Sequence, residues 1–125
     1  MEKLDTLRNG FDDCKVVGLA DISSRIVLCV SADKKPPQEK LDAYCTATAE
    51  LFDGAGAMPF AKAISRQEET QLTESIVLSD DQTLVFIRSS KDASEALFCV
   101  CDPRIVIDDF LNAARSGIEN LAEAS

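Results

Sequence analysis

Two cysteines separated by one residue form the closest pair of reactive side chains in the sequence. Cys99 and Cys101 flank Val100 in an apolar run, and alternate residues of a strand point to the same face of a sheet. Two thiols on one face suggest a metal or redox site, but structural zinc sites carry further ligands at wider spacing, often histidines. We therefore interpret Cys99 and Cys101 as small core residues of a central strand.

The remaining residue types exclude most catalytic chemistry. The 125 residues include no histidine, which is the commonest general base and a frequent metal ligand. A Ser-His-Asp or Cys-His centre cannot be formed, and Gly54-x-Gly56 lacks the third glycine of a dinucleotide-binding turn. Acidic pairs such as Asp80-Asp81 and Asp108-Asp109 fall at expected turns and helix starts, where carboxylates are usually solvated. The sequence predicts no catalytic residue, no metal ligand and no cofactor.

Net charge and cysteine content indicate which partners are disfavoured and which cellular compartment is expected. The net charge is −9, from 13 basic and 22 acidic residues, which disfavours binding to nucleic acid or to an anionic membrane. There is no run of about 18 apolar residues that would insert into a membrane, and the first residues do not resemble a secretory signal. The five cysteines are an odd number, which fits reduced thiols, so we expect a cytoplasmic protein.

Hydrophobic periodicity predicts a single α+β domain over residues 1–125. We expect helices at 4–12, from the prolines at 36 and 37 to about 52, and from Asp102-Pro103 onward. Strands are expected at 15–20, 25–31, 74–79, 83–88 and 96–101, where Val, Ile and Leu are concentrated. Residues 57–73 give no clear pattern, and within them the strongly polar stretch from Arg66 to Gln71 is expected to form a loop or a frayed strand. Two hairpins interrupted by helices indicate a five-stranded antiparallel sheet flanked by helices.

The second expected helix has a wider apolar side than one sheet needs. Its inner stripe consists of Leu41, Cys45, Thr48 and Phe52, while Tyr44, Leu51, Ala43 and Ala47 extend the apolar side along one flank. Small residues four apart permit another helix to approach closely, and tyrosine adds an amphipathic contact. This flank predicts contact with another chain, although alanine is also simply a good helix former.

Three stretches carry a resemblance to a known family. They are Val16-Val17-Gly18-Leu19-Ala20-Asp21 leading into Arg25-Ile26-Val27-Leu28, Ser75-Ile76-Val77-Leu78-Ser79-Asp80-Asp81 leading into Leu84-Val85-Phe86-Ile87, and Leu97-Phe98-Cys99-Val100-Cys101-Asp102-Pro103. With the element order α-β-β-α-β-β-β-α, they resemble the Roadblock/dynein light chain domain, within the profilin-like and longin-like group of folds. The resemblance spans residues 4–121. The first hairpin departs from the family in carrying Ser23-Ser24 where an Asp-Gly type of turn is usual.

The resemblance implies a non-enzymatic protein-interaction module. Members of the family form homodimers through the second helix and the adjoining third strand, which assigns the dimer or partner interface here to Tyr44, Ala47, Leu51, Ile76 and Leu78. It also implies that the dimer is an adapter or regulator of a small Ras-like GTPase or of a signalling complex.

Two other classes of function stay open. A small-ligand-sensing domain of the profilin-like or PAS-like kind requires an internal cavity between sheet and helix. The aromatic content of 6% and the absence of tryptophan give little sign of one. An enzyme or a thiol-based redox protein requires a reactive Cys99 or Cys101.

Overall fold

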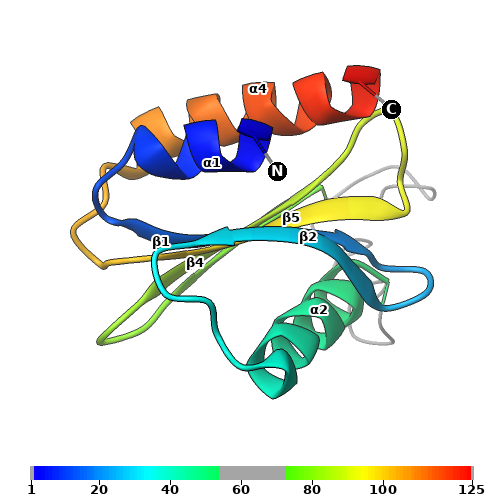
Figure 1. Cartoon of the computed structure of the whole chain (residues 1–125), viewed down its shortest axis with the longest axis horizontal. Helices are drawn as coiled ribbons and strands as arrows, with labels where there is room; N and C mark the ends of the chain where they lie inside the picture. The colour runs from blue at the N-terminus through cyan, green and yellow to red at the C-terminus, as the bar shows by residue number, and fades with distance from the viewer. Residues whose placement is uncertain (1, 54–72, 125) are drawn as a thin grey trace, which may run out of the picture.

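The chain folds into a five-stranded antiparallel sheet with helices on both faces, in a computed structural model that describes residues 2–53 and 73–124 (Figure 1). The helices are α1 (Glu2–Asn9), α2 (Gln38–Asp53) and α4 (Ile107–Ala124). The strands are β1 (Cys14–Asp21), β2 (Ile26–Ala32), β3 (Glu74–Leu78), β4 (Thr83–Arg88) and β5 (Glu95–Cys101). The predicted α+β class and element order are confirmed. The loop or frayed strand expected at 66–71 lies outside the described residues.

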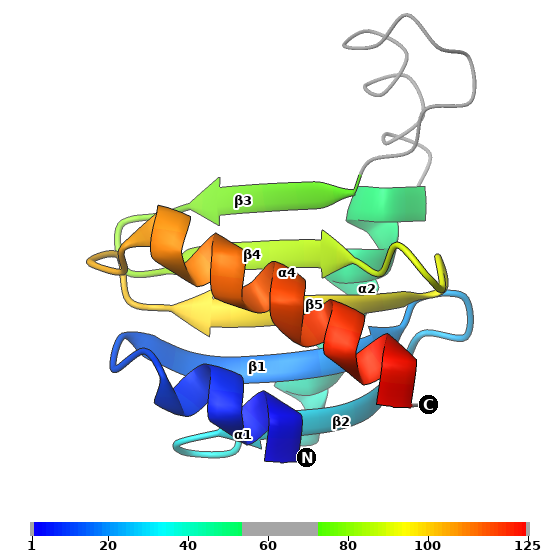
Figure 2. The same cartoon turned by 90° about the horizontal axis from the view of Figure 1, so that it is seen from above.

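The strands lie in the order β2-β1-β5-β4-β3, so β5 is central and β2 and β3 form the edges (Figure 2). Each hairpin pairs its own two strands, and β5 joins the hairpins by pairing with β1 on one side and β4 on the other. Helices α1 and α4 cover one face of the sheet and α2 covers the other (Figure 1).

The apolar core is divided into two clusters by the sheet. The cluster beneath α1 and α4 includes Leu97, Cys99 and Cys101 of the central strand with Leu4 and Phe110 of the helices. The cluster beneath α2 includes Val16, Ala20, Phe86, Phe98 and Val100 of the strands with Leu41, Cys45, Ala49 and Phe52 of the helix. The prediction that Cys99 and Cys101 are core residues on one face of a central strand is confirmed.

Helix α2 packs on the sheet through the stripe that periodicity predicts. Leu41, Cys45, Thr48 and Phe52 are all buried. The buried Thr48 hydroxyl donates to the Tyr44 carbonyl oxygen at 2.6 Å, so its polar group is satisfied within the helix. At the end of the helix the guanidinium of Arg88 lies 4.9 Å from the centroid of the Phe52 ring, a cation–π contact that joins α2 to β4.

The predicted start of the last helix is wrong. Helix α4 begins at Ile107 and not at Asp102-Pro103. The Asp102 carboxylate accepts a hydrogen bond from the Arg104 N–H at 3.0 Å, and the Ile105 N–H donates to the Asp102 carbonyl at 3.1 Å. These bonds close a turn, which is the alternative use of an Asp-Pro pair. Helix α1 also ends earlier than predicted, at Asn9, because Gly10 follows.

The first hairpin closes without glycine. The Asp21 carboxylate accepts hydrogen bonds from the backbone N–H groups of Ser23 and Ser24 at 3.0 and 3.2 Å. Arg25 then adopts a φ of 61°, in the left-handed region that an Asp-Gly type of turn would assign to glycine. Hydrogen bonds to the Asp21 side chain thus stabilise a turn in which Ser23-Ser24 stand in place of the usual Asp-Gly pair.

Candidate protein interface

The two edges of the sheet differ in regularity. In β2 the register shifts: Leu19 of β1 pairs with Cys29 whereas Ala20 pairs with Val27, so Leu28 is an extra residue in a β-bulge. Strand β3 pairs with β4 without any shift, from Glu74 opposite Ile87 to Leu78 opposite Thr83. A bulge disturbs further pairing, whereas a regular edge presents its free backbone groups in line. Of the two edges, β3 is the better template for an added strand.

The exposed residues of β3 are apolar. Ile76, Val77 and Leu78 are all exposed, and Leu78 exposes 76% of its surface. Because Ile76 lies opposite Val85, which packs beneath α4, Ile76 and Leu78 share the α4 face. Val77 lies opposite Leu84 and shares the α2 face. Three consecutive exposed apolar residues on a regular edge are a liability for a protein that leaves them in water.

The candidate residues on α2 form one flank of that helix. Ala47 is exposed, whereas Tyr44 and Leu51 are half-buried against the α2 cluster. The Tyr44 ring packs on Phe98 with a centroid distance of 5.6 Å and an interplanar angle of 30°. Its orientation is therefore held by the core, and one edge stays available to a partner.

The five residues assigned from the resemblance lie on two faces of the sheet. Tyr44, Ala47 and Leu51 lie on the α2 side, and Ile76 and Leu78 lie on the α4 side. Ser75 and Val77 are the β3 residues that share the α2 side, and neither was among the residues predicted from the sequence. Alternation along the strand separates Val77 from its neighbours, but only the register with β4 shows which set faces α2.

An ion pair holds the regular edge against α4. Arg115 donates from Nε and from an Nη atom to the two oxygens of Glu74, at 2.6 and 2.7 Å. The hydrogen bond from Arg115 lowers the pKa of Glu74, and partial burial opposes this only in part. The first residue of β3 is thus tied to the neighbouring helix, which preorganises the strand for pairing.

The buried thiols are poorly suited to nucleophilic or redox chemistry. Burial raises the pKa of Cys99 well above its ordinary value, and the nearby Cys14 adds to this. A hydrogen bond with Cys14, followed by burial, raises the pKa of Cys101. Both thiols are neutral at pH 7, whereas the thiolate is the nucleophile and the metal ligand.

The described part of the chain holds neither a candidate metal site nor a membrane-spanning helix. In residues 2–53 and 73–124 no group of three or more Cys, Asp or Glu side chains is placed to hold a metal ion. No helix there combines the length and the hydrophobicity needed to cross a bilayer.

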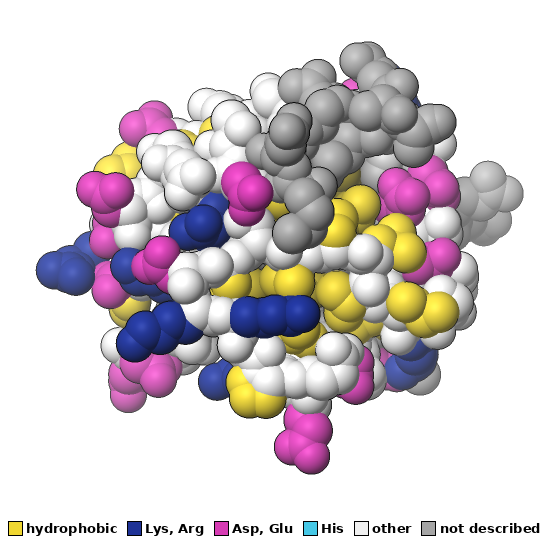
Figure 3. All heavy atoms as spheres, viewed as in Figure 1, with side chains coloured by type: hydrophobic (Ala, Val, Ile, Leu, Met, Phe, Trp, Pro, Cys, Tyr) yellow, Lys and Arg dark blue, Asp and Glu magenta, His cyan; other side chains and the backbone are white. Residues whose placement is uncertain are grey.

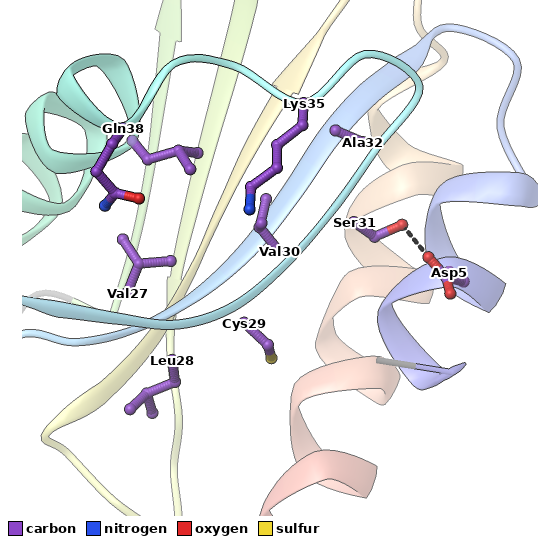
Figure 4. A pocket seen from close by; sticks show the side chains of 10 residues that line it. Asp5, Val27, Leu28, Cys29, Val30, Ser31, Ala32, Lys35 and Gln38 are labelled. Carbon is purple, nitrogen blue, oxygen red and sulfur yellow. Dashed lines mark hydrogen bonds between the residues drawn. The ribbon is translucent and has the colours of Figure 1, made fainter.

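A hollow of about 520 Å³ runs along the bulged edge of β2 (Figure 4). Lys35 reaches over it from the loop before α2, and Asp5 of α1 lies at its other end (Figure 4). Two of its polar side chains are already engaged with each other, because the Ser31 hydroxyl donates to Asp5 and accepts from Arg8 Nε at 2.8 Å. Ser31 and Asp5 are therefore satisfied without a ligand.

The space between α2 and the centre of the sheet is filled by one aromatic side chain. Phe98 is fully buried and lies so close to β1 that a Cβ atom on Gly18 would approach its ring to 2.1 Å. With Tyr44 packed on its other side, the ring occupies the position where a ligand-sensing domain of this architecture needs its cavity. The small-ligand alternative is therefore not favoured.

Comparisons with known proteins bear on the fold. The sequence matches no protein-family model, and no curated protein is similar to it in sequence. Among solved structures, MglB with a tetrameric arrangement is 20% identical, with a TM-score of 0.79 over 98% of this chain and 84% of that chain. The gliding protein MglB from Thermus thermophilus is also 20% identical, with a TM-score of 0.78 over the same shares of the two chains. A Roadblock/LC7 domain from Streptomyces avermitilis is 10% identical, with a TM-score of 0.75 over 98% of this chain and 94% of that one.

These similarities confirm the Roadblock-like fold that the order of elements predicts. At such low identity the likeness concerns the path of the backbone and not the side chains.

Proposed function

We propose, from the Roadblock-like fold and its regular apolar edge, that this chain is a non-enzymatic, cytoplasmic protein-interaction module. It forms a homodimer and acts as an adapter or regulator of a small Ras-like GTPase or of a signalling complex. The observation that carries the proposal is the unshifted register of β3 combined with the exposure of Ile76, Val77 and Leu78.

Pairing of β3 with its copy accounts for both sets of interface residues. A two-fold axis at the edge makes the two β3 strands antiparallel, so that each edge completes the hydrogen bonds of the other. The joined sheet then brings Val77 and the flank of α2 toward their copies on one face, and Ile76 and Leu78 toward theirs on the other. Burial of these apolar side chains is the driving force.

Two further observations support self-association and a protein partner. The arrangement named for one structural neighbour, MglB, is tetrameric, which makes self-association the first property to measure here. The neutral buried thiols and the filled core favour binding to a protein over nucleophilic chemistry or a buried ligand. The GTPase as partner follows from the resemblance to Roadblock domains.

The dimer is tested by a charge placed on β3. Leu78→Arg adds a cation at an exposed position, so the monomer stays folded, whereas the paired edge loses an apolar contact and has to bury a charge. Sedimentation velocity is expected to give twice 13.6 kDa for the wild type and 13.6 kDa for the variant. Leu28→Arg, on the bulged opposite edge, is the matched control and is expected to remain dimeric. A monomeric wild type at every concentration would overturn the dimer.

The partner is tested with purified small Ras-like GTPases from the same organism. The chain is expected to bind one of them and to change its rate of GTP hydrolysis. Ala47→Glu, on the exposed flank of α2, is expected to weaken the effect at least about threefold through a desolvated charge. Thr46→Glu places the same charge about 100° away on the other flank and is expected to have little effect. If no GTPase binds while the chain is dimeric, the regulatory part of the proposal fails and the dimer stands.

A further inference from the structure

Four lysines surround one surface hollow, although the chain as a whole carries a net charge of −9. The hollow has a volume of about 400 Å³ and is formed where the β2–α2 loop meets the ends of β1 and β5 and the β3–β4 turn. Its basic residues are Lys15, Lys34, Lys35 and Lys40. Figure 3 shows several Lys and Arg side chains on the side of the molecule where the β2–α2 loop lies in Figure 1.

The positive charge at this hollow is not compensated locally. None of the four lysines forms an ion pair with another described residue. Lys15 donates from Nζ to the backbone carbonyl of Asp12 at 2.9 Å, which leaves its charge unpaired. Two aspartates also line the hollow, but the carboxylate of Asp102 is already bound by Arg104 at 3.0 Å.

The other aspartate offsets only a fraction of this charge. The Asp81 carboxylate accepts a hydrogen bond from the Ser79 hydroxyl at 3.0 Å and lies in the β3–β4 turn. One available carboxylate therefore faces four ammonium groups, and the local potential is positive on an otherwise acidic surface.

The floor of the hollow is apolar and rigid. Val16 and Val100 belong to adjacent strands and are nearly fully buried, while Pro36 and Pro37 restrict the backbone of the loop. The Tyr44 ring, held against Phe98, completes the lining. A rim of flexible cations around a fixed apolar floor suits a ligand with both negative charge and an apolar side chain.

We infer that this basic hollow binds an acidic segment of a partner protein, in which carboxylates flank one apolar side chain. A lone phosphate would leave the apolar floor uncovered, and the lysines offer flexible point charges where a phosphate site usually offers converging backbone N–H groups. An anionic membrane presents a flat surface, which a concave site would not contact across its floor. The site lies apart from the outer edge of β3, and Tyr44 is the residue that it shares with the α2 flank of the proposed interface.

The test is a titration of the full chain with a fluorescein-labelled peptide in which glutamates flank a single central phenylalanine. Anisotropy is expected to show saturable binding that weakens between about 50 and about 300 mM salt, because these charges are solvent-exposed. Lys40→Glu is expected to weaken binding roughly three- to tenfold, and Lys34→Glu combined with Lys40→Glu at least about tenfold. Lys40 lies in the first turn of α2, where an acid is favourable, so these variants are expected to fold.

The matched control is Lys91→Glu, in the β4–β5 turn at the opposite end of the sheet (Figure 2). It changes the net charge equally and is expected to alter the affinity less than about twofold. The inference is overturned if Lys91→Glu weakens binding as much as Lys40→Glu, or if the peptide does not saturate. It is also overturned if inorganic phosphate or phosphatidylserine vesicles, and not the peptide, show the dependence on Lys34 and Lys40. Sedimentation of the same variants separates this result from a failure of the dimer.

Discussion

At Gly18 the missing side chain determines how closely β1 and the Phe98 ring approach each other. The position of a Cβ atom there is 2.1 Å from Phe98 Cζ, and two further ring atoms lie within 2.6 Å. Both residues belong to strands that are fixed on each side by hydrogen-bonded neighbours, so the ring has little space into which it can move. The glycine is required by this contact and not by its backbone angle.

Alanine at two glycine positions is expected to have opposite effects. Gly18→Ala is expected to lower the free energy of unfolding by about 2–3 kcal/mol, because the core is overpacked. Gly117→Ala is expected to raise it by about 0.5–1 kcal/mol, because the new methyl group meets only Leu7 at 3.6 Å in a helix interior. Urea unfolding of both variants measures the difference. Equal effects would contradict the packing of Phe98 on β1.

Thiol reactivity in the native state is expected to follow burial. Cys29, on the edge strand, is half-buried and should react first with a disulfide reagent, whereas Cys99 and Cys101 should react only on unfolding. Mass spectrometry of timed samples, with and without denaturant, identifies the order. Fast modification of Cys99 or Cys101 in the folded protein would restore a thiol-based function as a candidate.

At the scale of the elements, β3 and β2 each have a single hydrogen-bonded neighbour. The neighbour of β3 is β4, and the attachment of β3 to α4 includes the ion pair between Glu74 and Arg115. The opposite edge strand, β2, is less regular, because a β-bulge at Leu28 interrupts its hydrogen-bonded pairing with β1. The two edges therefore differ in how regularly they present backbone groups to another strand.

The attachment of β3 is expected to depend on pH. The pKa of Glu74 is lowered in the folded state from its ordinary 4.5, so its stabilisation is fully present above about pH 4.5 and is lost as the pH falls through the lowered value. Glu74→Gln is expected to destabilise the protein by no more than about 1 kcal/mol at pH 7, since the pair is partly exposed. Thermal unfolding of both proteins at pH 7 and pH 3 should show the difference shrinking at low pH. A difference that is constant or larger at pH 3 would contradict the ion pair.

At the scale of the whole molecule, the surface combines one apolar edge with one basic hollow. The edge suits a second copy of this chain because pairing across a two-fold axis satisfies identical strands. The hollow suits an acidic partner because its charge is opposite in sign to the rest of the surface. The two surfaces differ in chemistry and adjoin at Tyr44.

A homodimer makes thermal stability depend on protein concentration. The midpoint of unfolding is expected to rise by roughly 3 °C for each tenfold increase in concentration, because the folded dimer is favoured by mass action. Leu78→Arg should remove this dependence, and Leu28→Arg should keep it. A wild-type midpoint that does not change over a hundredfold range would contradict an interface at β3.

The order of the elements, the buried stripe of α2 and the common face of Cys99 and Cys101 follow from the sequence alone. Each depends on local periodicity, since residues spaced along one helix or one strand share a face whatever the rest of the chain does. The start of α4 was mispredicted because Asp102-Pro103 is compatible with both a helix cap and a turn, and the pairing of Asp102 with Arg104 selects the turn.

The tertiary structure decided the features that combine distant segments. The strand order determines that Ile76 and Leu78 face α4 while Val77 faces α2, and it brings Phe98 onto Gly18. It also brings Lys15 of β1 to the hollow beside Lys34 and Lys35 of the β2–α2 loop and Lys40 of α2. Alternation defines two faces of a strand, but only long-range pairing and register determine what covers each of them.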